Sequence, residues 1–210
     1  SPSNARRAHH PPHNSPPQQN SAPSKLATHQ EKIFAIDDHM AIAIAGLTAD
    51  ARTLARFMRN ECLNHKYSYD SSMETGRLVK VVADKHQEAT QTYSRRPYGV
   101  GLLVAGYDRT GPHLYQTSPS GNYYEYKGIA IGARAQSAKT YLERHFEKFA
   151  TCDRDELIRH AVTALRGCLQ GDATLSTLNT SVSVVGAGHP LQALQAEELE
   201  SYVADDDAAA

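Results

Sequence analysis

The sequence predicts an α+β fold in which helices lie outside antiparallel sheets. Short apolar runs with alternating residues end in turn residues, a pattern that is typical of strands in hairpins. Other segments carry apolar residues at three- and four-residue spacing, which is typical of amphipathic helices. Along the 210 residues, these strands and helices come in groups. Grouping favours the α+β class over a doubly wound sheet, in which strands and helices alternate.

Composition divides the chain into three parts. Residues 1–24 hold six of the ten prolines, and alanine is their only apolar residue type. Because such a segment buries too little apolar surface to offset the entropy lost on ordering, we expect a disordered Pro/Ser/His-rich tail. No Lys or Arg follows Arg166, and residues 189–210 are expected to be an acidic tail. Residues 25–188 then form one domain, which is long enough for a substantial core.

Charge and cysteine content argue against several classes of protein. The net charge is −1 and the basic residues form no stripe, so binding to nucleic acid has little electrostatic basis. No apolar run approaches the length that spans a bilayer. The three cysteines show no CxxC spacing, and their odd number argues against a disulfide framework. A reducing, intracellular setting fits this content.

Two strands and two helices are expected first in the folded region. Residues 32–36 and 40–46 read as strands joined by a tight turn, and the second strand is apolar on both faces. Thr48 is placed to cap the helix that follows. The apolar stripe expected on that helix is Leu47, Ala51, Leu54, Met58 and Cys62. A weaker helix is expected over residues 74–87, with an apolar side of Leu78, Val81 and Val82.

A run of antiparallel strands, two helices and a last strand are expected next. The strands cover residues 98–107, 112–117, 123–126 and 128–132, and the first two form a hairpin around the turn at 108–111. One helix covers residues 135–149. The next begins with Asp153 and Glu156 in capping-box spacing. Its expected buried stripe is Leu157, Ala161, Leu165 and Cys168. Residues 179–186 alternate as a half-buried strand, and no clear strand is expected after Gly188.

The eleven histidines raise the question of a metal site. His9, His10 and His13 lie together, but in Pro-rich sequence with no scaffold to fix a tetrahedral geometry. The other histidines are scattered, without an HxH or HxxxH pair. We therefore expect neither a metal site nor a cofactor.

Three short motifs are better explained by structure than by ligand binding. Residues 132–140 resemble a phosphate-binding loop, but the second glycine is missing and the lysine comes one position late. Gly99 and Gly101 lie within a strand, where close packing explains them. Residues 179–181 match a glycosylation sequon, and without a secretory signal the start of a strand is the preferred interpretation.

Nucleophilic catalysis by the first residue is the enzymatic alternative for this chain. Ser1 could act with its own α-amine as the base, and Lys32 lies where a helper amine is expected. Catalysis needs rigid positioning, however, and Pro2 followed by a segment that nothing fixes cannot supply it. We therefore expect no catalytic residue. A free-standing hydrolase that uses Ser1 stays as an alternative, which a Ser1→Ala change tests.

Several stretches of the chain resemble the proteasome α-subunit family. The resemblance covers roughly residues 25–186, and two stretches, 57–63 and 140–145, narrow it to one subunit type. The stretches that match the family's strand-to-helix signature and its central hairpin region are residues 44–52, 95–103, 106–108, 111–117, 118–123, 131–134 and 136–143.

The resemblance implies a four-layer αββα sandwich of two antiparallel sheets, the architecture of N-terminal nucleophile hydrolases. In the family, seven different α subunits form each outer ring of the 20S core particle, and catalysis belongs to the inner β subunits. The resemblance thus implies a non-catalytic subunit with a structural and gating role in ubiquitin-dependent and ubiquitin-independent protein degradation. The implied partners are other α and β subunits and, through the ring, an activator or regulatory particle, with no nucleic acid or membrane. The implied location is the cytoplasm and nucleus, with residues 48–87 facing the β ring.

The head of the chain departs from the family pattern. The family's gate-forming tail, ring-face helix and first two strands belong where residues 1–24 are rich in Pro, Ser and His. We therefore expect a sandwich that is incomplete at its N-terminal strands. Because unpaired sheet edges promote aggregation, this chain is expected to be poorly stable alone. The alternative is a degenerate or incompletely predicted gene product with no role in assembly.

Overall fold

The computed structural model describes residues 31–94, 96–170 and 174–204. Two antiparallel sheets and five helices make up this part of the chain, in the grouped order that an α+β fold requires. The tail expected at residues 1–24 lies outside the described residues. Within the described ranges, no helix combines the length and the apolar character needed to cross a membrane.

A five-stranded sheet forms the centre of the described chain. Each strand runs antiparallel to the next, and the strands lie in sequence order across the sheet. The register of the two central strands pairs Met40 with Gly106 and Gly46 with Val100. The five strands are β1 (Ile33–Asp37), β2 (Met40–Gly46), β3 (Val100–Asp108), β4 (Gly111–Thr117) and β5 (Tyr123–Glu125). The strands predicted at these places are confirmed to within two residues at each end.

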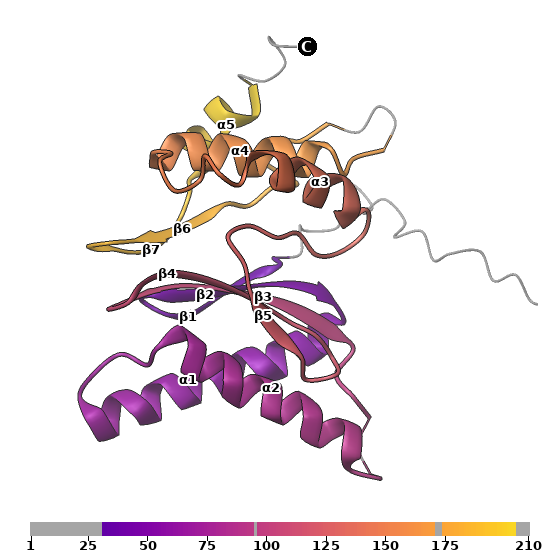
Figure 1. Ribbon diagram of the computed structural model, residues 1–210, viewed down its shortest axis with the longest axis vertical. Coiled ribbons are helices and arrows are strands. Elements are labelled where there is room, and N and C mark those ends of the chain that lie inside the picture. Colours follow the sequence, from indigo (N-terminus) through magenta and orange to yellow (C-terminus); the bar gives the residue numbers. More distant parts are fainter. Residues whose placement is uncertain (1–30, 95, 171–173, 205–210) are drawn as a thin grey trace, which may run out of the picture. The chain divides into compact units, whose positions relative to one another are not determined.

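Two helices, α1 (Thr48–Tyr69) and α2 (Thr75–Gln91), cover one face of this sheet (Figure 1). Alternate residues of β3 are buried beneath them, as period-two alternation predicts. Of the predicted α1 stripe, all members but the exposed Leu47 are buried. The core between the helices and the sheet includes Ile42, Leu54, Met58, Leu78 and Leu102.

Two details of these helices correct the sequence-based expectation. Thr48 is the first helical residue, and Leu47 occupies the N-cap position without a side-chain hydrogen bond, so the predicted cap is wrong. In α2, Val79 is buried and Val81 is only half-buried, because the helix turns Leu78, Val79 and Val82 toward the sheet. Propensity and spacing thus located the helices but misplaced one edge of the buried stripe.

Helices α3 (Ala135–His145) and α4 (Arg154–Arg166) follow the sheet in sequence. The predicted capping box of α4 is confirmed: the Glu156 N–H donates to Asp153 Oδ1 at 2.8 Å, and the Asp153 N–H donates to Glu156 Oε2 at 3.3 Å. α3 ends at His145, four residues before its predicted end at Phe149.

The expected buried stripe of α4 is wrong. Leu157 and Leu165 are 41% and 46% exposed, and the buried residues of α4 are instead Ile158, Val162 and Ala164. Leu157 and Leu165 line an apolar cavity of about 380 Å³, together with residues of β2 and β3 such as Ala43 and Leu103. The stripe is exposed because, within the described chain, a cavity rather than a packed sheet lies against it.

The last elements also differ from expectation. Strands β6 (Ser183–Gly186) and β7 (His189–Ala193) pair antiparallel, and helix α5 (Ala196–Ala204) follows, so the expectation of no strand after Gly188 is wrong. The Leu191 N–H donates to the Asp38 carbonyl at 2.6 Å, which ties β7 to the β1–β2 turn. Residues 128–132, predicted as a strand, form none, because no neighbouring segment in the described chain pairs with them.

Candidate functional site

Of the positions singled out for nucleophilic catalysis and metal binding, the structure describes only Lys32. Ser1, His9, His10 and His13 lie outside the described residues. Lys32 is exposed just before β1, and its carbonyl accepts the Ile44 N–H at 3.0 Å. Among the residues with a described structure, no group of three or more His, Cys, Asp or Glu is arranged to hold a metal ion.

Local hydrogen bonds and packing account for the short motifs, with the exception of Gly101. In the segment that resembles a phosphate loop, the Thr140 hydroxyl donates to the Gln136 carbonyl at 2.9 Å within α3. The side-chain oxygen of Asn179 accepts the Ser176 N–H at 2.7 Å, which holds the turn before β6. Residues 179–181 therefore precede the strand, and the prediction that they start it is wrong. A Cβ added at Gly99 would lie 2.8 Å from Leu47 Cδ1, so close packing is confirmed there. At Gly101 the nearest atom would be 3.6 Å away, which is an ordinary contact, so close packing does not explain that glycine.

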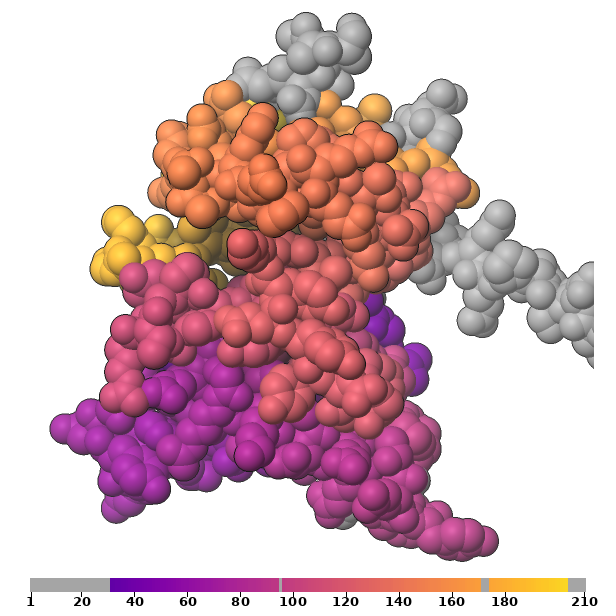
Figure 2. Space-filling model, in the orientation of Figure 1, coloured from indigo at the N-terminus to yellow at the C-terminus, as the bar shows by residue number. Residues whose placement is uncertain are grey.

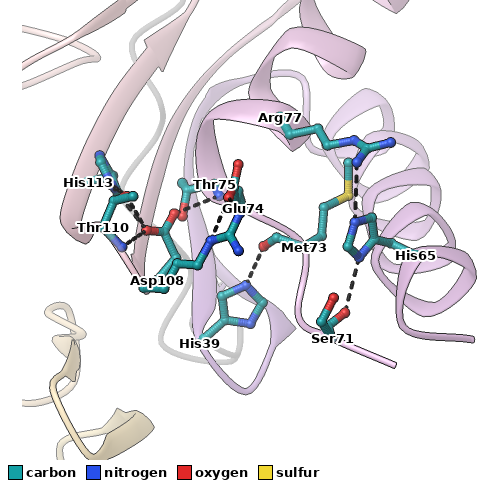
Figure 3. Close-up of polar contacts among 11 residues, drawn as sticks. His39, His65, Ser71, Met73, Glu74, Thr75, Arg77, Asp108, Thr110 and His113 are labelled. Carbon is teal, nitrogen blue, oxygen red and sulfur yellow. Dashed lines mark hydrogen bonds and ion pairs between the residues drawn. The ribbon is translucent and has the colours of Figure 1, made fainter. Parts of the chain in front are cut away.

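A polar cluster lies where the start of α2 meets the β3–β4 turn (Figure 3). A cavity of about 580 Å³ adjoins it, lined in part by His39, His65, Arg77 and Asp108. The residues of the cluster that Figure 3 labels are His39, His65, Ser71, Met73, Glu74, Thr75, Arg77, Asp108, Thr110 and His113. Sequence reasoning did not find this cluster, because its members are brought together from α1, α2, β3, β4 and three turns.

Asp108 is the centre of the polar cluster. Its carboxylate accepts the Thr75 N–H at 3.1 Å and the Thr110 N–H at 2.9 Å, as well as the Thr110 hydroxyl. Burial by itself would raise the pKa of Asp108, but the hydrogen bonds from Thr110 and Thr75 and the charge of His113 outweigh it and lower the pKa to about 2. An ionised Asp108 therefore holds the first turn of α2 against the hairpin, where a negative charge also suits the helix N-terminus.

Two histidines fix the loop between α1 and α2. His39 Nε2 donates to the Met73 carbonyl at 2.8 Å, and His65 Nδ1 donates to the Ser71 carbonyl at 3.1 Å (Figure 3). The Arg77 guanidinium donates to the other nitrogen of His65 at 3.4 Å. Beside them, Arg109 forms an ion pair with Glu74. These contacts join side chains to the backbone and to other side chains across elements, so the cluster supports the structure.

A second ion pair joins the start of α1 to the segment before β3. Asp50 is buried and accepts two hydrogen bonds from the Arg96 guanidinium, at 2.7 and 2.9 Å. It also accepts the Gly99 N–H at 2.8 Å. The hydrogen bonds from Arg96 lower the pKa of Asp50, with a further contribution from the Gly99 N–H, against the opposing effect of burial.

Replacing Asp108 with Asn is expected to remove an acid-sensitive part of the stability. Because folding lowers the pKa of Asp108 to about 2, its ionised form stabilises the fold above its ordinary pKa of 3.8, and this stabilisation is lost as pH falls toward 2. Unfolding in urea at about pH 5 and about pH 3 should show a smaller acid-induced loss in the variant than in the wild type. Asp84→Asn, on the exposed side of α2, is the control and should keep the wild-type loss. Equal losses in all three proteins would contradict the assignment.

Comparison with known proteins identifies the family of this chain. The sequence profile described as "Proteasome subunit" matches residues 18–185. The chain belongs to the proteasome subunit family. The match spans β1 to β5 and α1 to α4, so the proteasome family resemblance of the hairpin and helix segments is confirmed.

Named relatives within the proteasome family support the predicted subunit type. The chain is 56% identical to "Proteasome subunit alpha type-1" of Dictyostelium discoideum over 181 residues, which are 86% of this chain and 73% of that protein. It is 48% identical to the protein of the same name from Trypanosoma brucei rhodesiense over 180 residues, 86% of this chain and 68% of the relative. It is 47% identical to the protein of the same name from Drosophila melanogaster over 184 residues, which are 86% of this chain and 66% of the relative.

Proposed function

We propose that this chain is an α-ring subunit of the 20S proteasome core particle, with a structural and gating role in ubiquitin-dependent and ubiquitin-independent protein degradation. The observation that carries the proposal is the 56% identity to a protein named proteasome subunit alpha type-1 over 86% of the chain. The matched region includes the whole five-stranded sheet and the two helices that cover it. The names of the similar proteins, all proteasome subunits, do not favour the alternative that this chain is a degenerate fragment.

The proposed subunit is non-catalytic and carries no cofactor. In support, the carboxylates of the polar cluster and of the second ion pair are engaged by backbone N–H groups and arginines: Asp108 at the start of α2, Asp50 at the start of α1, and Glu74 beside Arg109. Such carboxylates serve as structural anchors rather than as bases aimed at a substrate. Ser1→Ala tests the competing hydrolase hypothesis, because loss of a peptidase or amidase activity on that change would favour it.

The proposed fold of the assembled subunit is the four-layer αββα sandwich. The α4 stripe supports it: Leu157 and Leu165 are exposed toward an apolar cavity that also borders the sheet residues Ala43 and Leu103. Burying each such leucine is worth about 1.5–3 kcal/mol, so further antiparallel strands laid in this space would gain stability. The pair β6 and β7 would belong to that second sheet. A structure of the chain within its assembly tests this proposal.

The proposed partners are other α and β subunits and, through the assembled ring, an activator or regulatory particle. The proposed location is the cytoplasm and nucleus, without contact to nucleic acid or membrane. Residues 48–87, which form α1 and the first part of α2, are proposed to face the β ring. Leu63 on α1 supports this, because its side chain is 66% exposed although the residue is large and apolar.

Affinity capture of the tagged chain from cells tests the proposed function. We expect other α and β subunits to be recovered with it at the size of the core particle. Leu63→Glu should lower this recovery because it places a charge on the proposed interface, whereas Leu178→Glu, at a residue that is 81% exposed in the loop before β6, should not. Recovery of the chain alone would refute the subunit role, and equal recovery of both variants would refute the proposed β-ring surface.

A further inference from the structure

His113 in β4 lies between two carboxylates that come from different strands. Its Nδ1 is 2.6 Å from Glu125 Oε1 in β5, and its Nε2 is 3.2 Å from Asp108 Oδ1 at the end of β3. Nε2 is also 2.7 Å from the hydroxyl oxygen of Thr110. Figure 3 shows the ring directed at Thr110 and Asp108. Both ring nitrogens thus face oxygen atoms.

This geometry selects one protonation state of the ring. The Thr110 hydroxyl donates to Asp108, so its oxygen is available to His113 only as an acceptor. Glu125 is an acceptor as well when ionised. Only the imidazolium form donates from both nitrogens, whereas a neutral ring must direct a lone pair at one of these oxygens.

We propose that His113 is a pH-sensitive latch: its doubly protonated ring ties the edge strand β5 to the β3–β4 hairpin, and loss of a proton releases β5. Through Asp108, which accepts the Thr75 N–H, the same latch reaches the first turn of α2. The latch therefore links the edge of the sheet to the helix that covers it.

Strand β5 lies at the edge of the five-stranded sheet. It is three residues long, all three are exposed, and it pairs only with β4 among the described strands. Next to it, the Tyr126 N–H donates to the Leu114 carbonyl at 2.8 Å. Residues of this region lie at the surface in the space-filling view, in pink and salmon (Figure 2). A short edge strand of this kind opens easily, so one charge-assisted contact has a large share in closing it.

The charges around His113 favour its protonated form. The hydrogen bond to Glu125 raises the pKa of His113, and the negative charges of Asp108 and Glu125 add to the rise against the opposing effect of burial. Tyr115 of the same strand stacks on the ring at 6.0 Å between centroids. The other charged groups nearby are Lys127 and Glu147, which line one cavity with His113 and Glu125, and the Glu74–Arg109 pair at the start of α2.

The direction of the pH dependence follows from the raised pKa. The latch contributes fully below the ordinary pKa of 6.5, and its contribution is lost as pH rises through the higher pKa of the folded chain. Alkaline release is therefore expected, in contrast to the acid-sensitive contribution of Asp108.

An NMR titration of the histidine ring in the full chain tests the latch. We expect the midpoint of the His113 titration to lie above pH 6.5 in the wild type and to be lower in Glu125→Gln. Each pH unit of this decrease corresponds to about a tenfold change in the equilibrium constant of the latch. Glu143→Gln on the exposed side of α3 removes one charge elsewhere and should leave the midpoint unchanged. A wild-type midpoint at or below 6.5, or equal midpoints in the two variants, would overturn the proposal.

Amide hydrogen exchange gives a second, independent readout. Exchange at the Tyr126 N–H, after division by the intrinsic rate at each pH, should speed up with rising pH in the wild type but not in His113→Gln. Parallel pH profiles for the two proteins would show that β5 opens without regard to His113, and the latch would then be refuted even if the ring titrates as expected.

Discussion

Replacing Gly46 with alanine is expected to lower the free energy of unfolding by about 3 kcal/mol or more. Gly46 ends β2 with φ +130°, a backbone conformation that residues with a Cβ rarely adopt. An added Cβ would lie 2.3 Å from the Gly99 carbonyl oxygen and 2.9 Å from Val100 Cα. Both are backbone atoms, of the residue just before β3 and of its first residue, so no side chain can rotate away to make room. The chain must pull β2 and β3 apart where α1 begins.

Two control glycines separate the causes of this loss. Gly111 has φ +124° with open space around a Cβ, so Gly111→Ala measures backbone strain alone and should cost about 1–2 kcal/mol. Gly186 has neither strain nor a close neighbour, and Gly186→Ala should stay within about 0.5 kcal/mol. Denaturant unfolding followed by circular dichroism measures all three. A Gly46 variant no less stable than the Gly111 variant would contradict the backbone clash.

Replacing Asp50 with alanine is expected to cost about 2–3 kcal/mol. The change leaves the Gly99 N–H without its acceptor and removes the partner of the Arg96 guanidinium. The Gly99 N–H thereby loses a hydrogen bond to a charged group, which contributes about 1.5–3 kcal/mol, whereas the exposed Arg96 can turn to water. Because the Asp50 carboxylate accepts the Gly99 N–H at the junction between α1 and β3, its loss should also speed amide exchange at Gly99.

The pH dependence of the Asp50 variant gives a further check. Because hydrogen bonds from Arg96 lower the pKa of Asp50, its stabilisation is present above the ordinary value of 3.8 and is lost as pH falls. Asp50→Ala should therefore differ most from the wild type near neutral pH and least in acid. Asp84→Ala, on the exposed side of α2, is the matched control. If it destabilises as much as Asp50→Ala, the cost does not come from the buried carboxylate.

Local sequence signals were sufficient wherever neighbours along the chain decide the outcome. The strand β2 was predicted with its observed ends, because period-two alternation followed by Gly46 is a property of the segment itself. The capping box of α4 was predicted for the same reason, since Asp153 and Glu156 are three residues apart. The α1 stripe of Leu54 and Met58 followed from helical spacing.

Predictions from the sequence failed where the burial or pairing of a residue depends on the segment that lies opposite it in the fold. The stripe of α4 has the right spacing, but Leu157 is exposed because it faces a cavity. Residues 128–132 have strand composition, but a strand also needs a partner. Composition predicts an acidic tail over residues 189–210, but pairing with β6 makes residues 189–193 a strand, and residues 196–204 form a helix that buries Leu199.

The sequence by itself determined the α+β class, the order of most elements and, through its resemblance, the proteasome family. Only the tertiary structure placed Asp50 beside Arg96, 46 residues away, and His113 between Asp108 and Glu125. The physical reason is the range of the interactions. Helix periodicity and capping act over a few residues of chain, whereas the partners of a buried carboxylate or a paired histidine are set by which strands and turns come together in the folded sheet.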